Sequence, residues 1–507
     1  MKLNYKKNDF KYEFSNIKIY TIILLFLVIY AFYNINILQT KVPEINDFNN
    51  QTLNLFIPSK ESYKFCQRTL FFTSEFKNKN IKNNFKISKI KLNKKYKNYF
   101  VTYLIDNDNY YYINLLNENG LLKNNFSFGY QNLIISDFIQ NSFKKYSLNK
   151  YQKVFHNING NSLFQKDILY KNYLNMKEYF NNDFNYMTET YYYPEQKDFI
   201  ENKFSNYKIN KNNLWLIKPK NKWAGKGIFI FKSLKKIKKK QYIITKYKTN
   251  LNLIKNKKYD LRLYVLVTGL RPLRIYFYKE GLVRIASEKY SLNINSFKNI
   301  FIHLTNTDIN KISKNYVYPN NTDDENANIW NLKTYKKYLK KNYNMDFNNI
   351  NIKIKDIIIK TIISVQDKLI QNNIDLNLSD NNFYNLLGFD ILITDKFEPI
   401  LLEVNNPPSL DIYDKVDLPM KTNIFIDTLN IVGIIPFSRK SFKSLDKQYI
   451  YKNNINQLVN NALCETYRPK GDYELIFPVK ENIFKYKKYF IHNNKENEKF
   501  WDKIIKK

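Results

Sequence analysis

The stretch LLGFDILITDKFEPILLEVNNPPSL, residues 386–410, decides the fold more than any other part of this 507-residue chain. Two apolar runs are joined by a polar turn at 395–399, a pattern that predicts a buried β-hairpin. Asp390, Glu403 and Asn405 lie on its strands, where an unpaired carboxylate is costly to bury. Oxygen ligands on buried strands suit Mg²⁺, so the stretch predicts a metal-binding hairpin.

A second stretch, KYDLRLYVLVTGLRPLRIYFYKEGLVRIAS, residues 258–287, precedes the hairpin. Alternation along a strand places Lys258, Asp260 and Arg262 on one face, and Arg284 lies on a later strand. Four of the seven arginines of the chain lie in this stretch. Arginine forks bind phosphate with two parallel hydrogen bonds, so the stretch predicts an anion site. A solvated outer face of the sheet is the alternative.

A third stretch, LWLIKPKNKWAGKGI, residues 214–228, reads as a strand, a glycine-bearing loop and a second strand. Gly225 and Gly227 would let backbone N–H groups approach phosphate oxygens, and Lys218 would supply positive charge. An ordinary hairpin turn is the alternative reading of the same residues.

The remaining periodicity predicts an α+β protein with mixed or antiparallel sheets. Apolar residues at helical spacing predict helices at 166–180 and 352–370. Short apolar runs predict strands at 242–247, and two separate strands at 273–278 and 282–286.

The composition indicates an anionic partner but does not identify which kind. The chain carries 82 basic and 45 acidic residues, a formal charge of +37. Nucleic acid, anionic membrane and acidic protein tails are therefore all partners that the charge would attract. No DNA- or RNA-binding motif is visible, which argues against specific nucleic-acid binding. Cys66 and Cys464 are too few for a disulfide framework and indicate a reducing compartment.

Taken in order, the three stretches resemble the ATP-grasp ligases, and specifically the tubulin-tyrosine-ligase-like family. The stretch FIHLTNTDINK, residues 301–311, carries the same resemblance, which covers roughly residues 150–435 and is strongest to the glutamylating members. The resemblance implies an ATP-grasp ligase core. Thr245 stands where family members usually carry Gln, beside the segment that frames adenine.

The resemblance also implies roles for individual residues, with ATP and Mg²⁺ as cofactors. The expected ATP-binding residues are Lys218, Gly225, Gly227, Lys246, Tyr247, Lys258, Asp260 and Asn306. The expected catalytic residues are Arg262, Arg284 and Lys258. The expected Mg²⁺ ligands are Asp390, Glu403 and Asn405. Lys166 matches an upstream basic position of the family.

The implied activity is ATP-dependent ligation of amino acids, glutamate first, to carboxylates of the acidic C-terminal tails of tubulin through an acylphosphate. Expected partners are therefore tubulin or microtubules and a free amino acid, in the cytoplasm on the cytoskeleton. A family member that uses glycine or tyrosine is one alternative. A catalytically inactive, membrane-anchored microtubule-binding protein is a second, and another ATP-grasp enzyme that acts on small molecules is a third.

We expect five regions along the chain. They are a basic N-terminus with an apolar segment (1–45), an N-terminal domain (46–150), a central ATP-grasp subdomain (151–250), a C-terminal ATP-grasp subdomain with the Mg-ATP site (251–435) and a basic C-terminal extension (436–507). The lysine-rich end, 480–507, reads as a solvated tail.

The apolar segment 19–38 contains no charge and is long enough to span a bilayer as a helix. A membrane anchor is the favoured interpretation; a signal sequence and a buried helix are the others. Lysines precede the segment, and the positive-inside rule would then place the rest of the chain in the lumen. That orientation conflicts with a cytosolic tubulin substrate.

Overall fold

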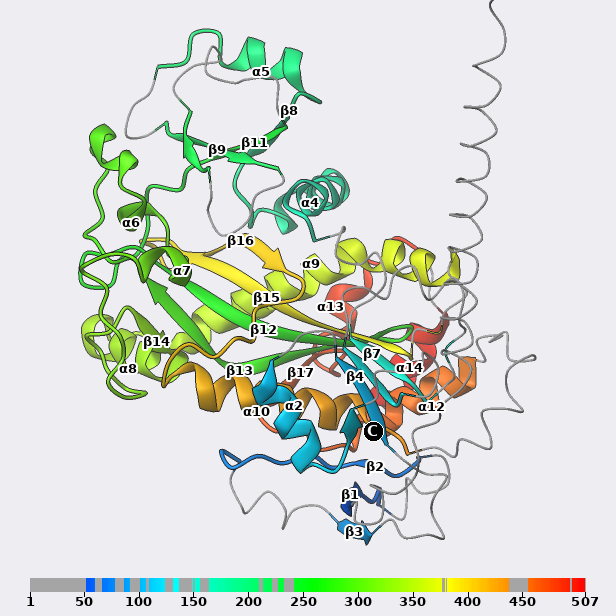
Figure 1. The fold of residues 1–507 in the computed structure, drawn as a ribbon. Coiled ribbons are helices and arrows are strands. Elements are labelled where there is room, and N and C mark those ends of the chain that lie inside the picture. Colours follow the sequence, from blue (N-terminus) through cyan, green and yellow to red (C-terminus); the bar gives the residue numbers. More distant parts are fainter. Residues whose placement is uncertain are drawn as a thin grey trace, which may run out of the picture.

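The architecture is described from a computed structural model of the chain. The structure describes residues 52–59, 66–77, 86–91, 101–105, 109–123, 131–135, 148, 151–155, 164–208, 213–220, 227–231, 241–375, 379, 381–436, 455–492 and 495–506. In this part of the chain the strands form three sheets, of three, four and ten strands (Figure 1).

The ten-stranded sheet is the centre of the molecule. Its strands are β4 (Thr102–Ile105), β5 (Leu122–Lys123), β6 (Leu133–Ile135), β7 (Lys153–Phe155), β12 (Tyr259–Leu270), β13 (Leu273–Ile285), β14 (Ile329–Asn331), β15 (Phe383–Ile393), β16 (Pro399–Asn405) and β17 (Tyr473–Phe477). β15 is antiparallel to β12 and β16 but parallel to β7. This mixed order confirms the predicted α+β class, and the β15–β16 pairing confirms the predicted hairpin.

One strand of this sheet was predicted to be interrupted, and that prediction is wrong. The two strands expected at 273–278 and 282–286 are a single strand, β13. Lys279 and Glu280 lie between them in sequence, but the strand continues because its first half pairs with β17 and its second half with β14. A β-bulge in the pairing with β12 absorbs the irregularity, and Gly281 fits there because a side chain would meet the backbone of Arg262.

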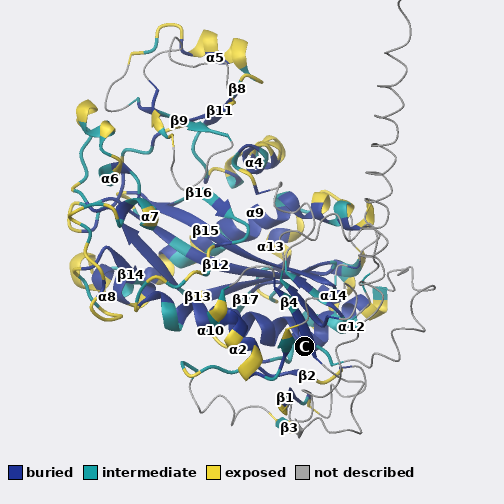
Figure 2. Ribbon diagram, viewed as in Figure 1, coloured by how far each residue is buried: buried dark blue, intermediate teal, exposed yellow. Residues whose placement is uncertain are grey.

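Helices cover both faces of the sheet, and the sheet separates two apolar cores. Odd-numbered residues of β12, such as Leu263 and Val265, belong to the core beneath α9 (Phe347–Asp375). Even-numbered residues, such as Tyr264 and Leu266, belong to the core beneath α10 (Asp417–Val432). Burial of both faces explains why most of the length of the central strands is dark in Figure 2. The predicted helix at 352–370 is confirmed as the middle of α9.

The four-stranded sheet lies above the large sheet in Figure 1. It comprises β8 (Thr190–Tyr193), β9 (Trp215–Pro219), β10 (Phe229–Ile230) and β11 (Tyr242–Lys246), with α5 (Lys197–Lys203) packed on it. The expected hairpin of 214–228 is confirmed, since β9 and β10 pair antiparallel. Helix α4 (Lys166–Phe180), which confirms another prediction, lies between this sheet and the large one, followed by the turn η5 (Asn181–Asp183).

Shorter helical elements accompany the main ones. They are η7 (Ile294–Lys298), α6 (Ile300–His303), α7 (Thr307–Asn310) and α8 (Leu332–Tyr343) between β13 and α9, and α2 (Tyr110–Glu118) beside α10. The three-stranded sheet, in order β2 (Thr69–Leu70), β1 (Thr52–Phe56), β3 (Ile87–Lys91), packs below the large sheet.

The C-terminal region is not a solvated tail, and that prediction is wrong. Helices α12 (Ile455–Thr466), α13 (Ile483–Lys487) and α14 (Lys495–Ile505) flank β17, which extends the large sheet. Their apolar side chains join the core under α9: Val459, Ala462, Ile483, Tyr486, Phe500 and Trp501. The lysines of this region lie between buried aromatics at helical spacing, and tertiary burial of those aromatics decides the structure.

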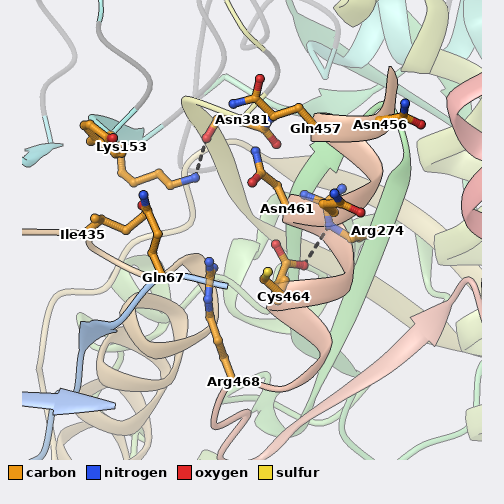
Figure 3. A pocket seen from close by; sticks show the side chains of 13 residues that line it. Gln67, Lys153, Arg274, Asn381, Ile435, Asn456, Gln457, Asn461, Cys464 and Arg468 are labelled. Carbon is orange, nitrogen blue, oxygen red and sulfur yellow. Dashed lines mark hydrogen bonds and ion pairs between the residues drawn. The ribbon is translucent and has the colours of Figure 1, made fainter. Parts of the chain in front are cut away.

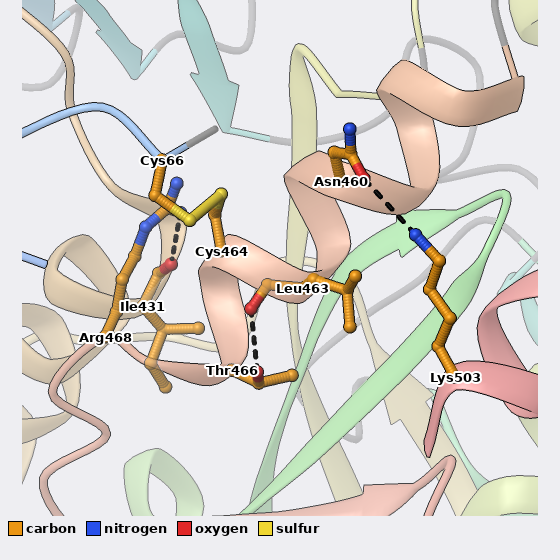
Figure 4. The surroundings of a disulfide bond; sticks show 8 residues. All are labelled: Cys66, Ile431, Asn460, Leu463, Cys464, Thr466, Arg468 and Lys503. Carbon is orange, nitrogen blue, oxygen red and sulfur yellow. Dashed lines mark hydrogen bonds between the residues drawn. A yellow bond between two sulfur atoms is a disulfide. The ribbon is translucent and has the colours of Figure 1, made fainter. Parts of the chain in front are cut away.

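The two cysteines are bonded to each other, although they are too few for a disulfide framework. Cys66 and Cys464 form a disulfide across 398 residues of sequence, with 5.3 Å between their Cα atoms (Figure 4). The bond joins the N-terminal strands to α12, and Arg468 lies beside it. A disulfide of this kind is typical of an oxidising environment rather than the reducing one that the cysteine count indicated.

The predicted membrane anchor, 19–38, lies outside the described residues. Among the residues that are described, no helix is both long and apolar enough to cross a bilayer.

Removing the disulfide should destabilise the fold markedly. We expect Cys464→Ser to lower the free energy of unfolding by about 2–5 kcal/mol, because the bond closes a very long loop in the unfolded chain. Denaturant unfolding monitored by circular dichroism measures this. Cys66→Ser should have the same effect, and the double variant no more, since both changes remove one bond. A reductant should lower the stability of the wild type alone; equal loss in the variants would contradict the role of the bond.

Candidate active site

The strand register brings the predicted charged residues into one row across the large sheet. Arg284 on β13 lies opposite Asp260 on β12. Two residues along β12, Arg262 lies opposite Asp390 on β15, which in turn lies opposite Glu403 on β16. Opposite charges therefore face each other between β13 and β12 and between β12 and β15, whereas Asp390 and Glu403 bring two carboxylates together on the hairpin.

Asp390 is the centre of this row. Its Oδ1 accepts a hydrogen bond from Nε of Arg262 at 2.5 Å, and its Oδ2 accepts from Nη2 of the same arginine at 3.1 Å. Nη2 of Arg284 lies 2.8 Å from Oδ2 and also binds Asp260. Burial alone would raise the pKa of Asp390, but the two guanidinium groups outweigh it and hold the pKa well below its usual range.

At Asp260 the effect of burial on the pKa outweighs that of the neighbouring arginine. Asp260 is fully buried, and burial raises its pKa above the usual range although Arg284 opposes the shift. Its carboxylate is engaged by Arg284, and the contact with ATP that the family resemblance implies stays a prediction.

Helix α4 ties the hairpin to the smaller sheet. Lys166, its first residue, places Nζ 2.9 Å from Oε2 of Glu403. The next residue, Asp167, forms an ion pair with Lys220, which follows β9; Oδ2 of Asp167 lies 2.7 Å from Nζ of Lys220. Lys166 was predicted only through the family resemblance, and the Asp167–Lys220 pair was not predicted, because the local sequence holds no signal for it.

Two lysines project from different sheets toward one region. Lys258 is buried, and its Nζ donates to the carbonyl of His303 at 2.8 Å and to the hydroxyl of Tyr247 at 3.4 Å. Lys218 lies at the end of β9 and is partly buried. Burial, followed for Lys218 by the charge of Lys166, lowers the pKa of each lysine to about 8. Within the described part of the chain, no carboxylate forms an ion pair with either, so both charges are available to an anionic ligand.

Tyr247 and His303 form a wall around Lys258. The hydroxyl of Tyr247 lies 3.0 Å from Nδ1 of His303, whose ring stacks on Phe297 at 4.1 Å. Burial and the adjacent charge of Lys258 lower the pKa of His303 to about 3, so its ring is neutral. Tyr247 was predicted as a site residue, whereas His303 was not, although His303 lies in the stretch 301–311 that carries the family resemblance.

The other predicted residues lie nearby but differ in what they contact. The side chain of Asn306 accepts hydrogen bonds from the backbone of Asp308 and Ile309 and so caps α7. Lys246 is exposed at the end of β11, next to Tyr247. Gly227 has φ +76°, a backbone conformation that glycine adopts without strain. Gly225 lies outside the described residues.

This geometry agrees with the comparison to known sequences. The sequence profile described as the tubulin-tyrosine ligase family matches residues 144–442, well over half of the chain. The chain belongs to the tubulin-tyrosine ligase family. The matched range contains every residue of the charged row and both buried lysines.

Relatives of this tubulin-tyrosine ligase family member include three enzymes named as tubulin polyglutamylases. The chain is 32% identical to tubulin polyglutamylase TTLL6 of Mus musculus over 68% of its own length and 44% of that protein. It is 29% identical to the Danio rerio protein of the same name over 68% and 46%. It is 33% identical to tubulin polyglutamylase TTLL5 of Mus musculus over 59% and 23%. The chain thus spans less than half of the length of these relatives.

The predicted Mg²⁺ ligands of this family member fit a cation by their chemistry. Oδ1 of Asp390 accepts one hydrogen bond, from Arg262, which leaves a lone pair. Asn405 donates its amide N–H to Asp390 at 3.3 Å, which leaves its amide oxygen. Beside it, both polar side-chain atoms of Asn406 are buried without a partner. Among the described residues, no cluster of three or more acidic, His or Cys side chains could hold a metal ion.

Nucleotide affinity should depend on pH through the two buried lysines. Each is charged below its pKa of about 8 and neutral above it. We therefore expect ATP affinity to be steady up to about pH 7 and to fall above about pH 8, by up to ~10-fold per pH unit for each lysine. Isothermal titration calorimetry with a non-hydrolysable ATP analogue measures this. Lys258→Met should remove one of the two contributions, and an affinity that is flat to about pH 9.5 would contradict the assignment.

Arg262 should not be replaceable by lysine. A single ammonium cannot make both hydrogen bonds to Asp390, so Arg262→Lys should lower turnover by about 100-fold while the chain remains folded. The measurement is ATP-dependent amino-acid incorporation beside a thermal unfolding curve. Wild-type turnover in this variant would show that the fork on Asp390 is not needed.

Proposed function

We propose that this chain is an ATP- and Mg²⁺-dependent carboxylate–amine ligase with an ATP-grasp core, which adds glutamate to the acidic C-terminal tails of tubulin. The observation that carries the proposal is the pair Lys258, which is buried, and Lys218, which is half-buried, neither of which forms an ion pair with a carboxylate of the described residues, beside an oxygen-ligand hairpin. Buried charges are costly unless a ligand neutralises them. Phosphate groups of a nucleotide would do so.

The proposed division of labour follows the geometry. Lys218 and Lys258, from the two sheets, would hold nucleotide phosphates, and Lys246 and Tyr247 would lie along the nucleotide. Asp390, Glu403 and Asn405 would hold Mg²⁺, which supplies charge neutralisation at the phosphates. Glu403 is paired with Lys166 in this structure, so ion binding would exchange an ammonium for a metal at that carboxylate.

The proposed chemistry activates a poor electrophile. The γ-phosphoryl group of ATP passes to a carboxylate oxygen of the tail, with ADP as the leaving group. The amino group of the incoming amino acid then attacks the carbonyl carbon of this acylphosphate, inorganic phosphate leaves, and a proton is lost from the nitrogen. Arg262 and Arg284 are fixed by Asp390 and Asp260 and would stabilise the transferred charge without reorganising.

Tubulin as substrate is supported by the names of the relatives and by charge. Each of the three relatives is named a tubulin polyglutamylase. The net charge of +37 would attract acidic tails. On this proposal the chain acts in the cytoplasm at the cytoskeleton. The disulfide is the feature that fits this location least, since cytosolic thiols are kept reduced.

Glu403→Gln should abolish ligation and leave the fold intact. The change keeps shape but removes the charge that binds a cation, so incorporation should fall at least ~100-fold. The purified chain is incubated with ATP, Mg²⁺, microtubules and labelled glutamate, glycine or tyrosine, and incorporation into tubulin is measured. Glu398→Gln is the matched control, because Glu398 lies in the same hairpin, is exposed and pairs only with Lys353 among the described residues.

The pattern of incorporation separates the alternatives. Glutamate alone, lost in Glu403→Gln and kept in Glu398→Gln, would support the proposal entirely. Glycine or tyrosine instead would keep the chemistry and change the amino acid. Microtubule binding without incorporation of any amino acid would overturn the enzyme in favour of an inactive binding protein.

A further inference from the structure

A second polar cavity lies at the opposite end of the β12–β13 hairpin from the candidate active site. Its volume is about 350 Å³, and its walls come from β7, β13, α12 and the segment after α12 (Figure 3). Thr268, whose hydroxyl contacts the cavity residue Glu465, is eight residues along β12 from Asp260. Eight strand residues span about 26 Å, so the two sites are separate.

Two of the charged residues in the cavity wall, Arg274 and Glu465, neutralise each other. Oε1 of Glu465 accepts hydrogen bonds from Nε of Arg274 at 2.9 Å, from Thr268 at 2.5 Å and from Tyr276 at 2.8 Å. Both ions are almost fully buried. This pair therefore contributes no net charge to the cavity.

Two further cations are left without a counter-ion. Nζ of Lys153 donates to the carbonyl of Asn381, and Nη1 of Arg468 donates to the carbonyls of Ile431 and Val432 at 2.8 and 2.7 Å. No carboxylate of the described residues forms an ion pair with Lys153 or Arg468. Carbonyl dipoles orient these groups but leave their charge unbalanced, so the cavity carries a net positive charge.

Removal from water makes the uncompensated positive charge of this cavity energetically unfavourable. Burial, with the nearby charge of Arg468, lowers the pKa of Lys153 to about 7. Burial is also the main cause of the lowered pKa of Arg468, with Glu465 opposing it. A bound anion would reverse both shifts, because it would restore the counter-charge that burial has removed.

The rest of the lining consists mostly of side-chain amides. Gln67, Asn381, Gln457 and Asn461 line the cavity, and Figure 3 shows them around the space between Lys153 and Arg274. Amides donate and accept hydrogen bonds, so they suit a ligand that carries both an oxyanion and neutral polar groups.

We propose that this cavity binds a small organic anion bearing carboxylate or phosphate groups, held by Lys153 and Arg468 with the amide lining around it. Its volume lies in the range of small-molecule sites and exceeds what a single inorganic ion fills. The walls are pre-organised, since Cys464 lines the cavity and is bonded to Cys66, which fixes α12 against the N-terminal segment. The assignment is independent of the ligase proposal.

The test is a binding measurement in a background that has lost one of the two lysines of the ligase's phosphate site. Lys258→Met provides it, because that lysine belongs to the other site. Pyrophosphate and citrate are titrated separately by isothermal titration calorimetry, one probe for each anion chemistry. Binding of either probe to Lys258→Met, weakened at least tenfold (~1.4 kcal/mol) by adding Lys153→Met, is the expected result. Preference between the probes identifies the anion class.

Two comparisons keep the result interpretable. Lys333→Gln removes one exposed positive charge elsewhere and should leave the affinity unchanged, which separates a site from general electrostatic attraction. Asn461→Leu changes an amide of the lining without touching either cation and should also weaken binding; it replaces Lys153→Met if that variant does not fold. Absence of binding by both probes, or equal affinity with and without Lys153→Met, would overturn the proposal.

Discussion

The carboxylate of Asp390, held between two guanidinium groups at the centre of the large sheet, is the interaction on which the candidate site depends. Removing one partner from such a buried pair costs about 3–5 kcal/mol, because an uncompensated charge remains. Arg262 and Arg284 come from neighbouring strands and meet at this one carboxylate. Their positions relative to the β15–β16 hairpin are therefore fixed before any ligand arrives, which is what stabilisation of developing charge requires.

Around this rigid row the structure keeps charges that are not compensated. Lys218 and Lys258 have lowered pKa values because burial removes solvent, and the nearby carboxylates of Glu403 and Asp260 offset this only in part. Lys153 and Arg468 repeat the arrangement in the second cavity, at the other end of the same hairpin. In both places uncompensated positive charge destabilises the fold, and a bound anion would offset that loss of stability. Perturbed ionisable groups of this kind are typical of ligand sites. The satisfied Arg274–Glu465 pair shows what a purely structural ion pair looks like in the same sheet.

The N- and C-terminal regions complete the body of the protein rather than extend from it. β17 adds to the edge of β13, the helices around it join the core beneath α9, and the Cys66–Cys464 bond fastens α12 to the N-terminal segment. These contacts hold the half of β13 that is far from the active site. The strand can then run unbroken from the second cavity to Arg284.

The sequence alone determined the elements whose signal is local. The hairpin at 386–410 follows from alternation and apolar runs, and the common face of Asp260 and Arg262 follows from the two-residue period of a strand. Tertiary structure decided whatever depends on residues far apart in the chain: the continuity of β13 across polar residues, the pairing of Lys166 with Glu403, the disulfide and the buried C-terminal helices. Periodicity shows which side of an element is buried but not which distant element covers it, because that choice depends on how the whole chain packs.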